Sequence, residues 1–297
     1  MTTAASDETD HLVIIGAGVL GCGIAALALA HGVAVTLADH TRPKLDQAEA
    51  AVTGHLKTAT LLGVCPEDIP HGRLDTTTGL EEAVARRPAA VIEAGTEDSI
   101  LKAGVLAQVG PHVPEGTPLI SNTSSVPVDE LADAVPRPED LLGAHFMDPP
   151  YLIATVEVIP GRRTGAGALS AAKAFLGVLR RTSILVRDSP GFVTSRLLHP
   201  MINDAARLVQ EGVASAEDVD ALMCGCLGHP SGPLRTADLI GIDNLADSLW
   251  VLHKRTGDER SRPCDLLLAK VRDGHHGRKS GRGFYDYAGG NSVKPHA

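Results

Sequence analysis

The 297-residue chain carries a net charge of −9 and no cluster of Lys or Arg, which disfavours nucleic acid or an anionic membrane as its main partner. We therefore expect a small-molecule ligand. The length is more than most single domains use, so we expect two domains. The N-terminal stretch MTTAASDETDH is polar and acidic, and no later stretch approaches twenty apolar residues. We therefore expect a soluble cytoplasmic protein without a membrane segment.

Five scattered cysteines, an odd number, are typical of a reducing compartment and not of a disulfide framework. The one close pair is Cys224 and Cys226, with His229 nearby. It lacks the second Cys or His cluster that a tetrahedral metal site needs. We therefore expect no bound metal and interpret the two thiols as small buried side chains of a helix.

The segment HLVIIGAGVLGCGIAALALAHGVAVTLADH predicts a βαβ unit. It comprises a strand over residues 12–15, a glycine-rich turn, an apolar helix to about residue 30 and a strand over residues 33–38. Further strand-like runs, most of them preceded by helix-like segments, cover residues 89–93, 118–121, 141–146, 154–159 and 182–186. This alternation predicts a mostly parallel sheet covered by helices.

After VRDSPGF, residues 186–192, the strand signals stop and amphipathic helical patterns take over. One helix is predicted to begin at Ser215, whose hydroxyl can cap a free N–H while Asp218 favours the positive end of the helix. We place a domain boundary near Asp188. Residues 1–188 are expected to form an α/β domain, and residues 189–297 an all-helical one.

The motif GAGVLG places Gly16, Gly18 and Gly21 between the first strand and its helix. This spacing lets a pyrophosphate approach the backbone and the helix N-terminus. Asp39 ends the second strand eighteen residues after Gly21. Its carboxylate would accept hydrogen bonds from the adenosine ribose and repel a 2′-phosphate, which predicts NAD as the cofactor; Arg42 close by keeps NADP open.

The stretch GAHFMDPPYLIATVEVIPG places His145 at the end of one apolar run and Glu157 inside the next. A buried carboxylate needs a partner, and the imidazole would supply one. NAD-dependent alcohol oxidation needs a base near neutral pH, so we interpret His145 as that base and Glu157 as the group that orients it. A core histidine beside a strand-edge glutamate is the structural alternative. SNTSS, residues 121–125, adds hydroxyl donors at the same sheet edge.

Segments along nearly the whole chain fit one pattern. They are GAGVLGCGIA, VIEAGTEDSILK, SNTSS, GAHFMDPP, VEVIPG, DSPGFVTSRLLHPMIND, EGVASAEDVD, HPSGPLRTADLIGID and RPCDLLLAKVRDGHHGRKSGRGFYDY. Together they resemble the 3-hydroxyacyl-CoA dehydrogenases, including the bacterial 3-hydroxybutyryl-CoA dehydrogenases. The resemblance implies a Rossmann-type NAD-binding domain, a helical C-terminal domain that dimerises, and a substrate cleft between the two.

The resemblance also implies individual roles. Ser124 would bind the substrate hydroxyl, with His145 as the base and Glu157 orienting it. Glu97 and Lys102 would line the nicotinamide ribose; a solvated helix start is the alternative for both. Further cofactor contacts are implied for Val19, Leu20, Asn122 and Asp148.

Two positions depart from the family's pattern. Asp148 stands where the family generally has Asn in HFFNP, and Ser195 where GFVVNR places an Asn near the substrate carbonyl. Ser195, which we count among the catalytic residues, is shorter but can still donate a hydrogen bond, directly or through water. An ionised Asp148 would attract the cationic oxidised nicotinamide ring, so we expect NAD⁺ to be favoured over NADH.

We expect NAD-dependent oxidation of a 3-hydroxyacyl thioester to the 3-oxoacyl thioester by a homodimer. Residues 44–63 retain only Lys44 and Lys57 as bases, thin support for the three phosphates of coenzyme A. The first alternative substrate is therefore a hydroxyacyl group on an acyl carrier protein, as in the biosynthesis of methoxymalonyl-type polyketide extender units. A free hydroxy acid such as L-gulonate is the second, and a non-catalytic NAD-binding protein is the alternative to an enzyme.

Overall fold

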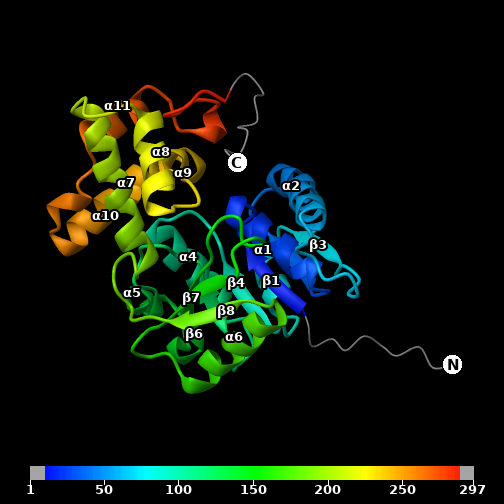
Figure 1. Ribbon diagram of the computed structural model, residues 1–297. Coiled ribbons are helices and arrows are strands. Elements are labelled where there is room, and N and C mark those ends of the chain that lie inside the picture. The colour runs from blue at the N-terminus through cyan, green and yellow to red at the C-terminus, as the bar shows by residue number, and fades with distance from the viewer. Residues whose placement is uncertain (1–10, 288–297) are drawn as a thin grey trace. The chain divides into compact units, whose positions relative to one another are not determined.

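The structure, a computed structural model, describes residues 11–287. The first ten residues, which include most of the acidic N-terminal stretch, and the C-terminal tail from residue 288 lie outside the described residues. The chain divides into two compact units after Phe192, and Figure 1 shows the elements of both. Between residues 11 and 287, no helix combines the length and the hydropathy needed to cross a bilayer.

The first unit is built on an eight-stranded sheet in the order β3-β2-β1-β4-β5-β6-β7-β8. Neighbouring strands from β3 to β6 pair in parallel, β7 is antiparallel to β6, and β8 is parallel to β7. The prediction of a mostly parallel sheet is confirmed, although β3 was not predicted. The strands are β1 (His11–Ile15), β2 (Ala34–Ala38), β3 (Leu74–Thr77), β4 (Ala90–Glu93), β5 (Leu119–Ser121), β6 (Leu141–His145), β7 (Thr155–Pro160) and β8 (Thr182–Leu185).

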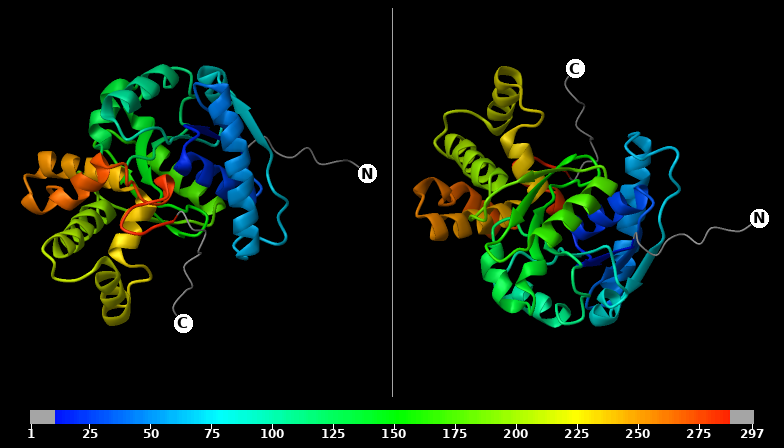
Figure 2. Two further views of the ribbon diagram at one scale, coloured as in Figure 1. Left: turned by 90° about the horizontal axis from the view of Figure 1, so that it is seen from above. Right: turned by 90° about the horizontal axis from the view of Figure 1, so that it is seen from below.

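Helices cover both faces of this sheet (Figure 2). In β1, the side chains of Leu12 and Ile14 join one hydrophobic cluster and those of Val13 and Ile15 another, because successive residues of a strand point to opposite faces. The first cluster includes side chains of α1 (Val19–Ala30), α2 (Arg42–Leu61) and α6 (Ala166–Val178). The second includes side chains of α3 (Leu80–Val84), α4 (Ser99–Val109) and α5 (Val128–Leu131).

The second unit is helical and has a hydrophobic core of its own. Its longest helix, α7 (Thr194–Gln210), packs against α8 (Ala216–Leu227), α9 (Pro233–Ile240), α10 (Ile242–Thr256) and α11 (Asp265–Arg272). The predicted helix start is confirmed, since the hydroxyl of Ser215 accepts a hydrogen bond from the N–H of Asp218 at 3.1 Å. Short 3-10 helices lie at Ala132–Ala134, Pro138–Asp140, Glu259–Ser261 and Arg278–Ser280.

Cys224 and Cys226 lie in α8, as expected, but the prediction that both are buried is wrong. Cys224 is half-buried and Cys226 is exposed. Residues two apart on a helix point to different sides, and α8 buries only Val219 and Asp220. The helix therefore lies at the surface of its unit.

Candidate active site

The turn between β1 and α1 is so tightly packed that the protein itself requires two of its glycines. Gly16 has a φ of +111°, and a Cβ built there would lie 2.7 Å from the carbonyl carbon of Ala94. A Cβ on Gly21 would overlap the carbonyl oxygen of Gly16. Gly18 differs, because a Cβ there would meet no atom of the described residues within 4 Å. The space beside Gly18 is open to a ligand.

Asp39 follows β2 and ties this turn to α2. Its Oδ2 accepts a hydrogen bond from the N–H of Ala17 at 2.8 Å and lies 2.8 Å from Nζ of Lys44. Its Oδ1 accepts one from the N–H of His40 at 2.8 Å. Burial would raise the pKa of Asp39, but these partners outweigh it and hold the pKa below its ordinary value. The ionised carboxylate keeps capacity for about one further hydrogen bond, such as one from a ribose hydroxyl.

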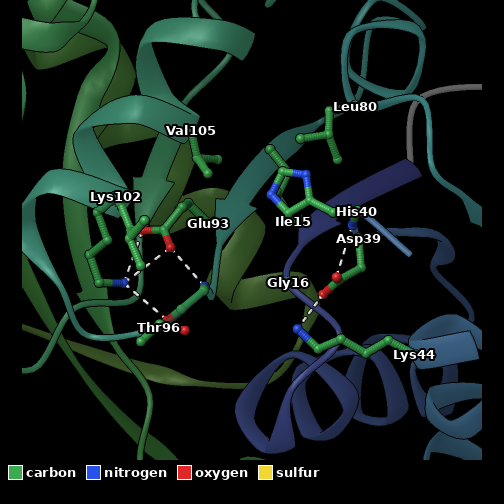
Figure 3. Close-up of a pocket in the computed structure, with 12 residues that line it drawn as sticks. Ile15, Gly16, Asp39, His40, Lys44, Leu80, Glu93, Thr96, Lys102 and Val105 are labelled. Carbon is green, nitrogen blue, oxygen red and sulfur yellow. Dashed lines mark hydrogen bonds and ion pairs between the residues drawn. The ribbon is translucent and has the colours of Figure 1, made fainter. Parts of the chain in front are cut away.

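A pocket of about 190 Å³ lies at the carboxyl edge of the sheet. Asp39 and Lys44 line one side of it, and Glu93 and Lys102 line another (Figure 3). The strand order changes direction between β1 and β4, which is where open α/β sheets bind their ligands. The volume is smaller than that of a typical small-molecule site, so the pocket can take only part of a dinucleotide.

Glu93, which was not predicted as a site residue, forms a buried ion pair with Lys102. Lys102 Nζ lies 3.0 Å from Oε2 of Glu93, and both side chains are 1% exposed. The N–H of Gly95 and the hydroxyl of Ser121 also donate to Glu93, each at 2.7 Å. The sequence did contain a signal for this ion pair, since a glutamate ends the apolar run AAVI nine residues before a lysine.

Glu97 organises the turn that follows β5. Its Oε1 accepts hydrogen bonds from the hydroxyls of Thr123 and Ser125, from the N–H groups of Ser124 and Ser125, and from the Ser124 hydroxyl at 3.2 Å. Its Oε2 lies 3.5 Å from Nζ of Lys102. Burial would raise the pKa of Glu97, but Lys102 and these hydrogen bonds outweigh it and lower the pKa. The structure thus brings Glu97, Lys102 and Ser124 together.

His145 and Glu157 stand directly opposite each other on the antiparallel strands β6 and β7. Residues in such register share one face of the sheet, and here Nδ1 of His145 lies 2.8 Å from Oε2 of Glu157. Both side chains are buried, and the ring of Phe192 lies 6.0 Å from that of His145. With the Nδ1 proton directed at Glu157, the lone pair of the imidazole is on Nε2.

The other predicted site residues are distributed as follows. The side-chain oxygen of Asn122 accepts a hydrogen bond from the N–H of Phe146 at 2.9 Å and so links the ends of β5 and β6. Val19 and Leu20 form the start of α1, the first exposed and the second half-buried. Ser195 is buried in the first turn of α7, in the helical unit.

Asp148 is half-buried in the segment after β6. Burial raises the pKa of its carboxyl, an effect that His55 opposes. This shift works against the ionised state on which the expected preference for NAD⁺ rests.

Two family descriptions match the chain. The description "3-hydroxyacyl-CoA dehydrogenase, NAD binding domain" matches residues 11–189, and "3-hydroxyacyl-CoA dehydrogenase, C-terminal domain" matches residues 191–287. A probable 3-hydroxybutyryl-CoA dehydrogenase of Deinococcus radiodurans is 40% identical over 278 residues, which cover 92% of this chain and 99% of the relative. A probable 3-hydroxybutyryl-CoA dehydrogenase of Bacillus subtilis is 37% identical over 289 residues, which cover 94% of this chain and 98% of the relative.

Solved structures resemble this one across both units. FadB2 of M. tuberculosis has a TM-score of 0.88 at 34% identity and covers 95% of this chain and 100% of its own. The (S)-3-hydroxybutyryl-CoA dehydrogenase of Ralstonia eutropha has a TM-score of 0.80 at 34% identity, with coverage of 94% and 99%. The likeness therefore extends over the sheet and the helical unit alike.

Gly18→Ala and Gly21→Ala form a matched pair of variants. We expect Gly18→Ala to keep the wild-type Tm but to weaken NADH binding about tenfold or more, because its methyl group would occupy the open space. Gly21→Ala should lower stability by about 1 to 3 kcal/mol, because its methyl group overlaps Gly16. Thermal unfolding and titration with NADH by fluorescence measure both effects. Equal losses of Tm, or unchanged NADH affinity in Gly18→Ala, would contradict this assignment.

Asp148→Asn should change how stability depends on pH. A carboxyl whose pKa is higher in the folded than in the unfolded chain makes the folded state bind more protons. The wild type therefore loses stability as pH rises through the window from 3.8 to that raised pKa. Asn does not titrate, so the variant should gain stability relative to the wild type above this window. Urea unfolding over a pH series measures the difference, and a difference that is constant with pH would refute the burial of an ionisable carboxyl.

Proposed function

Because the chain belongs to the 3-hydroxyacyl-CoA dehydrogenase family, we propose that it oxidises a 3-hydroxyacyl-CoA to the 3-oxoacyl-CoA with NAD. The observation that carries this proposal is the buried His145–Glu157 pair, held in register across β6 and β7. When bound, NAD would accept the hydride that leaves the substrate carbon. The protein's own part is to bind, to orient and to move the hydroxyl proton.

In this proposal, His145 takes the substrate's hydroxyl proton on Nε2 and Glu157 stabilises the imidazolium that forms. Ser124 binds the substrate hydroxyl. Its N–H and hydroxyl both donate to Glu97, which supports a fixed position for this side chain. Ser195 would take the place of the amide that polarises the thioester carbonyl in related enzymes.

The cofactor is proposed to lie along the carboxyl edge of the sheet. The open space at Gly18 and the first turn of α1, with Val19 and Leu20, would hold the pyrophosphate. Asp39 would accept a hydrogen bond from the adenosine ribose. The nicotinamide half would then lie toward β4 and β5, where the predicted contacts are Glu97, Lys102, Asn122 and Asp148.

Coenzyme A is the proposed carrier because the relatives at 37–40% identity are named for 3-hydroxybutyryl-CoA. An acyl carrier protein is the second candidate, and one observation favours it. The ammonium of Lys44 forms an ion pair with Asp39. Of the two lysines in residues 44–63, this leaves only Lys57 to bind a phosphate of coenzyme A.

We further propose that the protein is a cytoplasmic homodimer joined through its helical unit. Leu197, Leu222 and Leu227 on α7 and α8 are 70%, 57% and 66% exposed, and apolar exposure of this extent is typical of an interaction surface. All five cysteines are free thiols, as is usual in a reducing compartment.

A substrate panel tests the activity. We expect the highest kcat/KM for NAD⁺ reduction with 3-hydroxybutyryl-CoA, and lower values with the same acyl group on an acyl carrier protein and with L-gulonate.

His145→Gln should lower kcat roughly 100- to 10,000-fold and leave NADH affinity nearly unchanged, because it removes only the base. If the wild-type protein binds NADH but turns over none of the three substrates of the panel, it is a non-catalytic NAD-binding protein.

Glu157→Gln tests the orienting carboxylate through the pH profile of oxidation. Loss of the nearby anion disfavours the protonated imidazole, so the acid limb of the profile should move to lower pH while kcat falls. Glu115→Gln, a change at an exposed glutamate, should leave the profile in place. A folded Glu157→Gln variant with the wild-type profile would give Glu157 a purely structural role.

A further inference from the structure

Three charged side chains at the carboxyl end of β4 form what we call the β4 cluster: Glu93, Glu97 and Lys102. Two carboxylates share one ammonium, since Nζ of Lys102 lies 3.0 Å from Oε2 of Glu93 and 3.5 Å from Oε2 of Glu97. With all three groups ionised, the cluster has one negative charge in excess.

Both carboxylates are surrounded by hydrogen-bond donors. Glu93 is surrounded by donors, namely the N–H of Gly95, the hydroxyl of Ser121 and the ammonium of Lys102. Oε1 of Glu97 accepts five hydrogen bonds from the turn after β5, and its pKa is lowered. In these hydrogen bonds both carboxylates act only as acceptors, as expected beside the ammonium of Lys102.

Two of the three groups are poorly screened. Glu93 and Lys102 are 1% exposed, so water and salt reach them only weakly, whereas Glu97 is about a third exposed. The other ion pair that lines the pocket, Asp39 and Lys44, is balanced within itself and lies on the opposite side (Figure 3). It therefore does not cancel the charge of the β4 cluster.

The position of the β4 cluster in the sheet determines which half of the cofactor would interact with this charge. Asp39 follows β2, on the side of the switch point that takes the adenosine half. β4 and β5 lie on the other side, under the nicotinamide half. That ring carries a positive charge when it is oxidised and none when it is reduced.

We propose that Glu93 is a positioning residue that fixes Lys102 and leaves the β4 cluster with one uncompensated negative charge, which makes the site bind NAD⁺ more tightly relative to NADH. This inference rests on the proposed function for the location of the nicotinamide. The preference for NAD⁺ over NADH is thus assigned to Glu93 and not to Asp148. Burial disfavours the charged form of the Asp148 carboxyl, whereas Glu93 is ion-paired and accepts further hydrogen bonds. Without the charge of Glu93, Lys102 and Glu97 would neutralise each other.

Glu93→Gln tests the proposal by direct titration of the purified protein with NAD⁺ and with NADH, without substrate. The ratio of the NAD⁺ to the NADH dissociation constant should rise about tenfold, the effect of one poorly screened charge at moderate distance. The rise should persist in roughly 0.5 M salt, because the substituted side chain, Glu93, is buried. Ser121→Ala is the matched control, since it removes a hydrogen bond to the same carboxylate and no charge. It should change the ratio less than about twofold.

Glu97→Gln is the second variant in case Glu93→Gln does not fold, because Glu97 is about a third exposed and its loss removes the same charge. It should raise the ratio in the same direction. A ratio that stays at the wild-type value in variants that bind both nucleotides, including equal losses of both affinities, overturns the inference and leaves the proposed function standing. Wild-type protein that binds neither nucleotide overturns the proposed function as well.

Discussion

Parallel pairing of β2, β1, β4, β5 and β6 brings five strand ends to one edge of the sheet. Three titratable groups of the first unit's candidate site stand at these ends: Asp39 after β2, Glu93 at the end of β4 and His145 at the end of β6. Apolar side chains fill both faces below the edge, so these three groups gather at the edge. Contacts among residues far apart in the chain therefore follow from the direction of the strands.

The same burial explains why the sequence predicts the central strands. Strands covered on both faces are continuous apolar runs, and β1, β2, β4 and β6 were predicted within one or two residues. β3, with the sequence LDTT, is an edge strand whose four residues are all half-buried. It needs no apolar run, so only its pairing with β2 identifies it.

A similar distinction applies to the candidate site. His145 and Glu157 lie twelve residues apart on strands that pair with each other, so a local pattern was enough to link them. The partners of Glu93 include Ser121, 28 residues away on another strand, and no local pattern connects the two. Lys44 was considered only as a base for coenzyme A, because its ion pair depends on how α2 begins after β2.

The pairing of β6 with β7 also affects how this molecule could diverge. Residues 142–145 pair with residues 157–160, while residues 146–154 lie outside the ladder. Substitutions or insertions in that connecting loop can reshape the adjoining surface and leave the register intact. A single residue inserted within β7 ahead of Glu157 would turn the carboxylate to the opposite face of the sheet. An insertion in the loop therefore leaves the pairing of His145 with Glu157 in place, whereas an insertion inside either strand breaks it.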